Sequence, residues 1–277
     1  MTGPVAVVRP RRIAWVEGPD AMALLHGLLT ADVQAIPVGG AARSLVLTTH
    51  GHVVAGMAVA RDDDQAFTLV LDPPPARDGA EVIQAHHVSE DAEVLGPEDA
   101  QVLVATDDLA AALAGAGDLQ VPGAIPGTIE VLSDDPAAIA AERGIALSDP
   151  GLLEALRVQR GAPAIGVDTA EGTLVQEALL DGAVSFDKGC YLGQETVARL
   201  HYRGHPNRRL ARIALQGPVP PGTAIESTGG APSPGQVTSV AEVPGEGWMA
   251  LGMVRREVPD GADVTLGDVA GRVLPPP

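Results

Sequence analysis

The chain has 277 residues, of which 45% are hydrophobic and 19% charged, a composition that is typical of a packed globular protein and excludes a disordered one. This length is enough for two or three domains. The formal net charge of -18 repels phosphate backbones at long range, so we expect no direct nucleic-acid partner. No apolar stretch reaches the roughly 18 residues of a membrane helix, and the N-terminus lacks the apolar run of a signal peptide. We therefore expect a cytoplasmic monomer that does not contact membranes.

The first hundred residues predict strands interrupted by two helices. A strand through Ile13 and Trp15 precedes a helix over 20–29, which Asp20 is expected to cap. A second helix is expected over 77–90, and two further strands on either side of Gly96-Pro97. Between the helices, three alternating runs separated by turn residues predict an antiparallel meander: 43–48, 52–60 and 66–71.

The middle of the chain predicts three more helices. An alanine-rich helix over 107–117 stops at glycine, and a strand followed by a helix is expected within 119–144. The clearest helix covers 149–160, where Asp149 is the expected N-cap, Pro150 occupies the first turn, and Gly161 follows the end.

From residue 208 the sequence consists of short alternating runs that glycine and proline interrupt at intervals of about eight to twelve residues. This spacing is typical of a small separate β-barrel or sandwich of about 70 residues. We expect the boundary between two domains, 1–205 and 206–277, just before this region.

The segment "FDKGCYLGQE", residues 186–195, holds the only lysine of the chain, Lys188, and the only cysteine, Cys190. Residues 184–193 predict a strand that ends in a glycine turn, and a helix is expected to begin near Gln194. Cys190 would then precede a helix N-terminus, where the positive end of the helix dipole favours an anion. The alternatives are a small buried hydrophobic cysteine and a plain surface charge at Lys188.

Two features surround this segment. Three of the six aromatic residues of the chain lie within it or close by, which indicates either one well-packed hairpin or the wall of a ligand pocket: Phe186, Tyr191 and Tyr202. A basic stretch follows, which is either a solvated linker or a clamp for an anionic ligand: Arg199, His201, Arg203, His205, Arg208, Arg209 and Arg212.

A single cysteine forms no internal disulfide and supplies no cysteine-based metal site. We therefore expect no metal, and we give His50 and His52 no role.

The string "FDKGCYLGQETVARLHYRG" resembles the signature of the YgfZ-type folate-binding proteins. These are bacterial relatives of a mitochondrial iron-sulfur assembly factor, and they share the fold of the glycine-cleavage T-protein, an aminomethyltransferase (GcvT-like). The resemblance extends over almost the whole chain, through "GPDAMALLHGLLTADV", "TTHGHVVAGMAV", "LRVQRGAPAIGVD" and "GQVTSVAEVPGEGWMALGMVRRE".

The resemblance implies an α+β fold with two interlocked N-terminal subdomains and a small C-terminal β-barrel. It implies that the centre binds tetrahydrofolate or a folate derivative. It also implies that the protein supports the assembly or repair of iron-sulfur enzymes, including tRNA-modifying ones, with iron-sulfur client or assembly proteins as partners. Lys188 and Cys190 match the family's functional pair, and the remaining residues expected at the folate site are Tyr191, Gln159, Arg157, Gln194, Glu195, Arg199 and Arg203.

The chain differs from the pattern at two places. It has Gln159 where relatives often carry a glutamate that holds the pterin ring, and its counterpart of the T-protein's catalytic aspartate is either Asp72 or Asp78. Two further functions therefore stay open: a folate-dependent aminomethyl or one-carbon transferase that acts on a small amine, and a non-enzymatic binding module whose acidic surface docks a basic partner.

Overall fold

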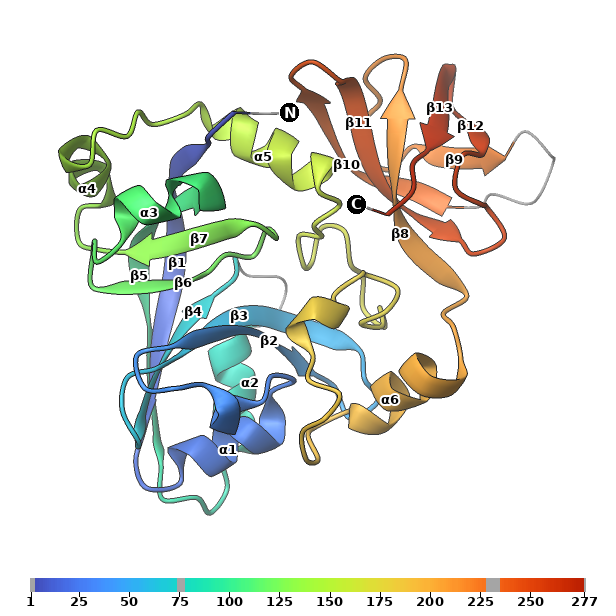
Figure 1. The fold of residues 1–277 in the computed structure, drawn as a ribbon. Helices are drawn as coiled ribbons and strands as arrows, with labels where there is room; N and C mark the ends of the chain where they lie inside the picture. Colours follow the sequence, from blue (N-terminus) through green and yellow to red (C-terminus); the bar gives the residue numbers. More distant parts are fainter. Residues whose placement is uncertain (1–2, 74–77, 228–234, 277) are drawn as a thin grey trace.

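The computed structural model describes residues 3–73, 78–227 and 235–276 of the chain. The first half forms one antiparallel seven-stranded sheet with the order β2-β3-β4-β1-β5-β7-β6 (Figure 1). The strands of this sheet are β1 (Ala6–Glu17), β2 (Ala41–Leu47), β3 (Val53–Arg61), β4 (Ala66–Leu71), β5 (Glu93–Thr106), β6 (Leu119–Pro122) and β7 (Thr128–Leu132). The long strands β1 and β5 pair along almost their whole length and join the two halves of the sheet.

The predicted meander is confirmed as β2-β3-β4, with bounds that differ from the expected ones by at most two residues. The two strands expected around Gly96-Pro97 are a single strand, β5, so this prediction was wrong. Gly96 has a φ of +85° and lies where the β1–β5 register shifts between Ile13 and Trp15. A glycine at a β-bulge therefore gave the same signal as a glycine at a turn.

Among the described residues, six α-helices lie around the sheet and beside the barrel: α1 (Ala21–Leu28), α2 (Gly79–His86), α3 (Ala110–Leu113), α4 (Pro136–Glu142), α5 (Pro150–Gln159) and α6 (Gln194–Arg203). Three short 3-10 helices complete the described elements: η1 (Val33–Ala35), η2 (Asp107–Leu109) and η3 (Asp181–Ala183). None of the helices among these residues is both long and apolar enough to cross a membrane.

The predicted caps have different outcomes. Asp149 caps α5 as expected, because its carboxylate accepts the N–H of Gly151 at 2.7 Å. The Asp20 prediction was wrong, since its side chain makes no cap bond to α1. Its carboxylate instead accepts the N–H of Asp91 at 2.8 Å, which fastens the start of α1 to the loop before β5.

The core consists mainly of aliphatic side chains, as the low aromatic content predicts. Helices α1 and α2 cover one face of the sheet, where Leu25 and Ile83 pack with Met57 and Phe67. Helix α5 packs its Leu153 and Leu156 against the other face. Each fully buried aliphatic side chain contributes about 1.5–3 kcal/mol, so these two layers hold both faces of the sheet.

The C-terminal region is a closed six-stranded barrel with the order β10-β11-β8-β13-β12-β9. Its strands are β8 (Arg208–Leu215), β9 (Ala224–Ser227), β10 (Gly235–Val243), β11 (Gly247–Arg255), β12 (Asp263–Leu266) and β13 (Val269–Val273). The expected fold class, α+β with a GcvT-like arrangement and a small C-terminal β-barrel, is confirmed. The division into domains 1–205 and 206–277 falls between α6 and β8 and stays a prediction.

Helix α5 joins the two parts of the molecule (Figure 1). Its Leu153 and Leu156 face the sheet, whereas Ala155 and Val158 pack against the barrel, where they contact a cluster that includes Leu251. The helix predicted most clearly from the sequence is thus the element that holds the barrel beside the sheet.

Candidate functional site

The segment 184–193 carries the Lys-Gly-Cys-Tyr motif and is irregular, so the predicted strand was wrong. Its backbone bonds to the turn that follows α1 and to the end of that helix: the N–H of Ser185 donates to the carbonyl of Thr30 at 2.9 Å, and that of Leu192 to the carbonyl of Gly27 at 3.1 Å. Because these N–H groups donate to carbonyls of α1 and of the turn after it, they do not pair with a neighbouring strand. Helix α6 begins at Gln194, as predicted.

Lys188 is buried, with an exposed fraction of 8%. Its ammonium donates to three backbone carbonyls at the end of α1, those of His26 at 2.6 Å, Leu29 at 2.8 Å and Ala31 at 2.9 Å. Three carbonyls that converge on one nitrogen fit a compact ammonium with three donors and do not fit a planar guanidinium. This geometry explains why this position has a lysine and not an arginine.

Burial of the Lys188 ammonium lowers its pKa to about 8. Because its three N–H donors are all used by carbonyls, none remains for the thiol of Cys190 or for a ligand. Lys188 therefore anchors the segment to α1.

Cys190 is exposed and lies beyond this anchor. The turn that follows it depends on Gly193, whose φ is +81° and where a Cβ would lie 2.4 Å from the carbonyl oxygen of Thr48. Only glycine fits such a left-handed position against another backbone. The anchor and the turn together fix the backbone on both sides of an exposed thiol.

The three aromatic residues near the motif do not form one wall. Tyr191 is buried with Leu45 and Leu47, and burial raises its pKa to about 12. Phe186 stacks on the ring of His201 with 3.7 Å between centroids, while Tyr202 is 63% exposed. Tyr191 is therefore part of a packed core and not of a pocket wall, although the segment does not form the hairpin offered as the alternative.

A cavity of about 560 Å³, here called the Asp72 cavity, lies between β1, the end of β4, helix α5 and the loop after α5. Apolar side chains form part of its wall, among them Leu153, Ile125 and Ile165. Charged side chains also line it: Arg9, Arg11, Arg12, Asp72, Asp99, Glu154 and Arg157. This volume and this mixture are those of a small-molecule site.

The structure separates the two aspartate candidates. Asp72 lines the cavity, forms an ion pair with Arg43, and lies against Gly56, where a Cβ would meet its carboxylate. Asp78 instead caps α2 by accepting the N–H of Ala80 at 2.8 Å, and it pairs with Arg12. Of the two carboxylates, Asp72 is the one placed to meet a ligand.

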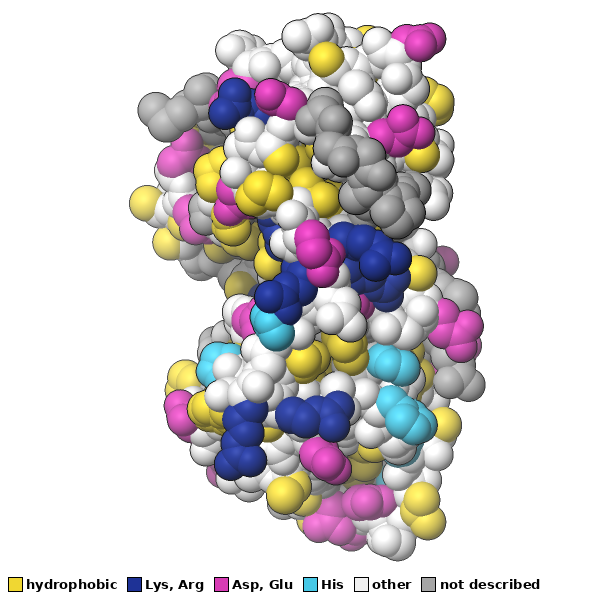
Figure 2. All heavy atoms as spheres, turned by 90° about the vertical axis from the view of Figure 1, so that its right-hand side faces the viewer, with side chains coloured by type: hydrophobic (Ala, Val, Ile, Leu, Met, Phe, Trp, Pro, Cys, Tyr) yellow, Lys and Arg dark blue, Asp and Glu magenta, His cyan; other side chains and the backbone are white. Residues whose placement is uncertain are grey.

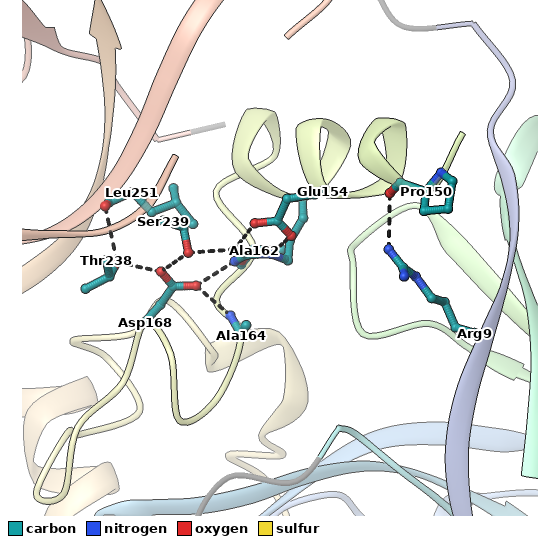
Figure 3. A network of polar contacts seen from close by, with 10 residues as sticks. Arg9, Pro150, Glu154, Ala162, Ala164, Asp168, Thr238, Ser239 and Leu251 are labelled. Carbon is teal, nitrogen blue, oxygen red and sulfur yellow. Dashed lines mark hydrogen bonds and ion pairs between the residues drawn. The ribbon is translucent and has the colours of Figure 1, made fainter. Parts of the chain in front are cut away.

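Arg157 lines the cavity and belongs to a buried network that joins α5 to the barrel. Its guanidinium donates to Glu154 at 2.6 Å, to Asp168 at 2.5 Å and to the hydroxyl of Ser239 on β10 at 2.7 Å. Asp168 is 2% exposed and also accepts from the N–H of Ala164 and the hydroxyls of Thr238 and Ser239 (Figure 3). The hydrogen bonds of the Arg157 guanidinium thus hold the barrel on α5. Arg157 also lines the cavity, but its donors are used within this network.

The other residues expected at the folate site do not line the Asp72 cavity. Gln159 reaches the barrel, where its amide donates to Glu246 at 2.5 Å. Gln194 is the first residue of α6, and the side chains of Glu195, Arg199 and Arg203 are exposed along that helix.

Sequence reasoning missed the arginines of β1. Arg9, Arg11 and Arg12 line the cavity, and Arg11 forms a buried two-pronged ion pair with Glu130 at 2.7 and 2.9 Å. The available signal was the run "VVRPRRIAW", in which arginines interrupt an otherwise apolar strand. Asp168 gave no comparable signal.

A second cavity of about 630 Å³ adjoins the first. It lies between β2, the β6–β7 connection and the loop 179–183, and Ala124 lines both cavities. Arg43 lines this second cavity while its ion-pair partner Asp72 lines the first. In the described residues, no three His, Cys, Asp or Glu side chains gather as ligands for a metal.

Comparison with known proteins agrees with this architecture. Residues 207–277 match the family described as the C-terminal beta-barrel domain of CAF17. The chain is 30% identical over 225 residues to the tRNA-modifying protein YgfZ of Edwardsiella ictaluri, covering 70% of this chain and 66% of that protein. It is 33% identical over 109 residues to the mitochondrial iron-sulfur cluster assembly factor IBA57 of Mus musculus, covering 36% of this chain and 29% of that protein.

The fold resembles a solved structure over nearly its whole length. The glycine cleavage system aminomethyltransferase T from Bartonella henselae superimposes with a TM-score of 0.80 and 19% identity, covering 98% of this chain and 85% of that one. The sequence matches span 66% and 29% of the two relatives, less than two thirds of either. With the signature segment, the barrel and the shared fold in agreement, the chain belongs to the YgfZ-type family with a GcvT-like fold.

Proposed function

We propose that the protein binds tetrahydrofolate in the Asp72 cavity and supports the assembly or repair of iron-sulfur enzymes, including tRNA-modifying ones. The observation that carries the folate proposal is the cavity itself. It has about 560 Å³, apolar walls, and both carboxylate and guanidinium groups at its lining.

The lining suits the parts of a folate. The pterin is flat and carries amino and ring N–H donors, which carboxylates such as those of Asp72 and Glu154 accept. The benzoyl group is apolar and matches Leu153 and Ile165. The glutamate is anionic and matches the guanidinium of Arg9, which lines the cavity and forms no ion pair among the described residues, through charge-assisted hydrogen bonds. Bound folate would supply a one-carbon carrier at this position.

The iron-sulfur part of the proposal rests on the relatives and on Cys190. One relative is named an iron-sulfur cluster assembly factor and another a tRNA-modifying protein. The chain presents its single thiol at the surface, on a segment that Lys188 fixes to α1. An exposed thiol with a fixed backbone is accessible to a partner protein, which a buried structural cysteine is not.

The test is complementation of a strain that lacks the gene, with the activity of an iron-sulfur tRNA-modifying enzyme as the readout. Cys190→Ser is expected to accumulate and fold as the wild type does and to abolish the rescue. Glu195→Gln, an exposed change on α6, is the matched control and is expected to rescue fully. A fully active serine variant would overturn the proposed role of the thiol.

A folate-dependent aminomethyl or one-carbon transferase is the second candidate. It is favoured by one observation, the carboxylate of Asp72 in the cavity of a fold shared with an aminomethyltransferase. Such a carboxylate is suited to stabilise positive charge or to accept a proton at the folate nitrogen. The assay is formation of methylene-tetrahydrofolate from a small amine donor. Turnover that Asp72→Asn abolishes would support the transferase, and absence of turnover with all amines tested would exclude it.

A further inference from the structure

A cationic surface lies where α6 leads into the barrel. Figure 2 shows one group of Lys and Arg side chains across the middle of this face and a second group below it, with histidines beside them. We name this surface the arginine patch, and it consists of Arg199, Arg203, His205, Arg208, Arg255 and Arg256.

Three segments bring these residues together. Arg199 and Arg203 lie one turn apart on α6, whose last turn leads directly to His205. The β8–β11 register places Arg208 opposite Arg255. Arg256 follows at the end of β11; its side chain contacts the ring of His205, and its N–H donates to the carbonyl of Asn207 at 3.0 Å.

The patch is poorly neutralised. Glu177 pairs with Arg208 at 2.9 Å, but no ion pair among the described residues involves Arg199, Arg203, Arg255 or Arg256. Next to the patch, Arg209 has its own partner, Asp260, at 2.5 Å.

Two further carboxylates lie close in sequence: Glu195 precedes Arg199 by one turn of α6, and Glu257 follows Arg256. Both are exposed, and neither forms an ion pair with the patch in the described structure.

This arrangement costs stability. Like charges directly opposite in a strand pair destabilise the sheet, and the Arg208–Arg255 pair is such a case. The chain has 36 acidic and 18 basic residues, so carboxylates are abundant elsewhere on it. A cationic surface with a single ion pair, between Arg208 and Glu177, on so acidic a protein indicates that further compensating charge comes from another molecule.

We infer that the arginine patch docks an acidic segment of a partner protein. Guanidinium groups pair with carboxylates through two parallel hydrogen bonds, which gives affinity and orientation. A nucleic acid fits less well. A duplex carries about one negative charge per 1.7 Å along its axis, so most of its phosphates would lie beyond a small patch. These phosphates would then be repelled by the rest of the chain, whose formal net charge is -18. A short acidic segment places its charges on the patch alone.

The test is fluorescence anisotropy with a labelled α-linked peptide of alternating Asp and Glu, ten residues long, added to the full chain. The double variant Arg199→Glu/Arg255→Glu is expected to weaken binding at least tenfold, and added salt is expected to weaken wild-type binding. Arg272→Glu makes half of this charge change on the barrel, at a side chain that is 66% exposed. Arg272 lies opposite Ala214, at the far end of β8 from Arg208. This control is expected to bind within twofold of the wild type.

Two results would overturn the inference. One is equal peptide binding by the wild type and the double variant, with circular dichroism showing both folded. The other is tighter binding of a single-stranded RNA of ten nucleotides than of the peptide, lost in the same double variant, which would assign the patch to nucleic acid.

Discussion

The Lys188 anchor and the Asp168 network both bury a charged group, yet they satisfy it in different ways. Lys188 has backbone carbonyls as its hydrogen-bond acceptors, all from the end of α1 and the turn that follows it. Asp168 accepts from an arginine, two hydroxyls and a backbone N–H that come from α5, the loop after it and β10. The first fixes a local segment that presents Cys190, and the second fixes the barrel on α5. A buried charged group thus holds the Cys190 segment in place in one region, and in the other it joins the barrel to the rest of the molecule.

The largest effect is expected from Asp168→Ala. Removing this carboxylate leaves the Arg157 guanidinium with only Glu154 as a charged partner, and breaking a buried ion pair in this way costs about 3–5 kcal/mol. Urea unfolding followed by circular dichroism measures the loss. Arg272→Met is the control, because its pairing with Asp263 is exposed, 4.0 Å long and expected to contribute under about 0.5 kcal/mol. An Asp168→Ala variant as stable as this control would contradict the structural role of the network.

Lys188→Met is expected to cost about 2–3 kcal/mol, because carbonyls at the end of α1 lose their donor while the side-chain volume is kept. Lys188→Arg keeps the charge but cannot place one nitrogen among three carbonyls, so it should not restore wild-type stability. The unfolding free energies of the three proteins, measured in parallel, decide this point. Full stability of the arginine variant would show that charge alone matters at this position.

The ionisation of Lys188 links stability to pH. Its pKa is lowered by burial from 10.5 in the unfolded chain to about 8 in the folded one. Between these values the unfolded state binds more protons, so this group makes the free energy of unfolding rise with pH, by at most about 1.4 kcal/mol per pH unit. This contribution is lost as the pH falls through about 8. The difference in stability between wild type and Lys188→Met should therefore widen from pH 8 to 10, and a constant difference would contradict the shift.

Cys190→Ser should have the smallest effect on stability, within about 0.5 kcal/mol, because the side chain is exposed. The melting temperatures of Cys190→Ser and Lys188→Met, measured in parallel, separate the exposed thiol from the buried anchor, although the two positions are only two residues apart. A large loss at Cys190 would mean that the thiol is part of the packing and would weaken its proposed role toward a partner.

The sequence predicted elements whose signals are local. The meander depends on alternation within each strand, and the start of α5 depends on Asp149 and Pro150. The unusual residues Lys188 and Cys190 were also recognised, because a single lysine and a single cysteine stand out in composition. What such signals describe is the residue and its immediate neighbours.

The sequence did not predict interactions that depend on distant residues. The carbonyl of His26 lies 162 positions from Lys188, and Ser239 lies 71 positions from Asp168. The helix before the signature drew attention to Gln159, yet that side chain reaches Glu246 on the barrel, while Glu154 of the same helix lines the cavity. Which face of a helix meets a cavity follows from how the barrel packs on it, and this packing has no local sequence signal.

The most direct test of the central claim, a tetrahydrofolate site in the Asp72 cavity, is the shift in melting temperature with added tetrahydrofolate. A ligand that binds only the folded state stabilises it by about 2.7 kcal/mol at a hundred times its Kd. We predict a clear rise for the wild type, the same rise for Gln159→Glu, whose position does not line the cavity, and a much smaller rise for Asp72→Asn. No rise for the wild type at millimolar tetrahydrofolate, or a rise that Asp72→Asn leaves intact, would contradict the assignment.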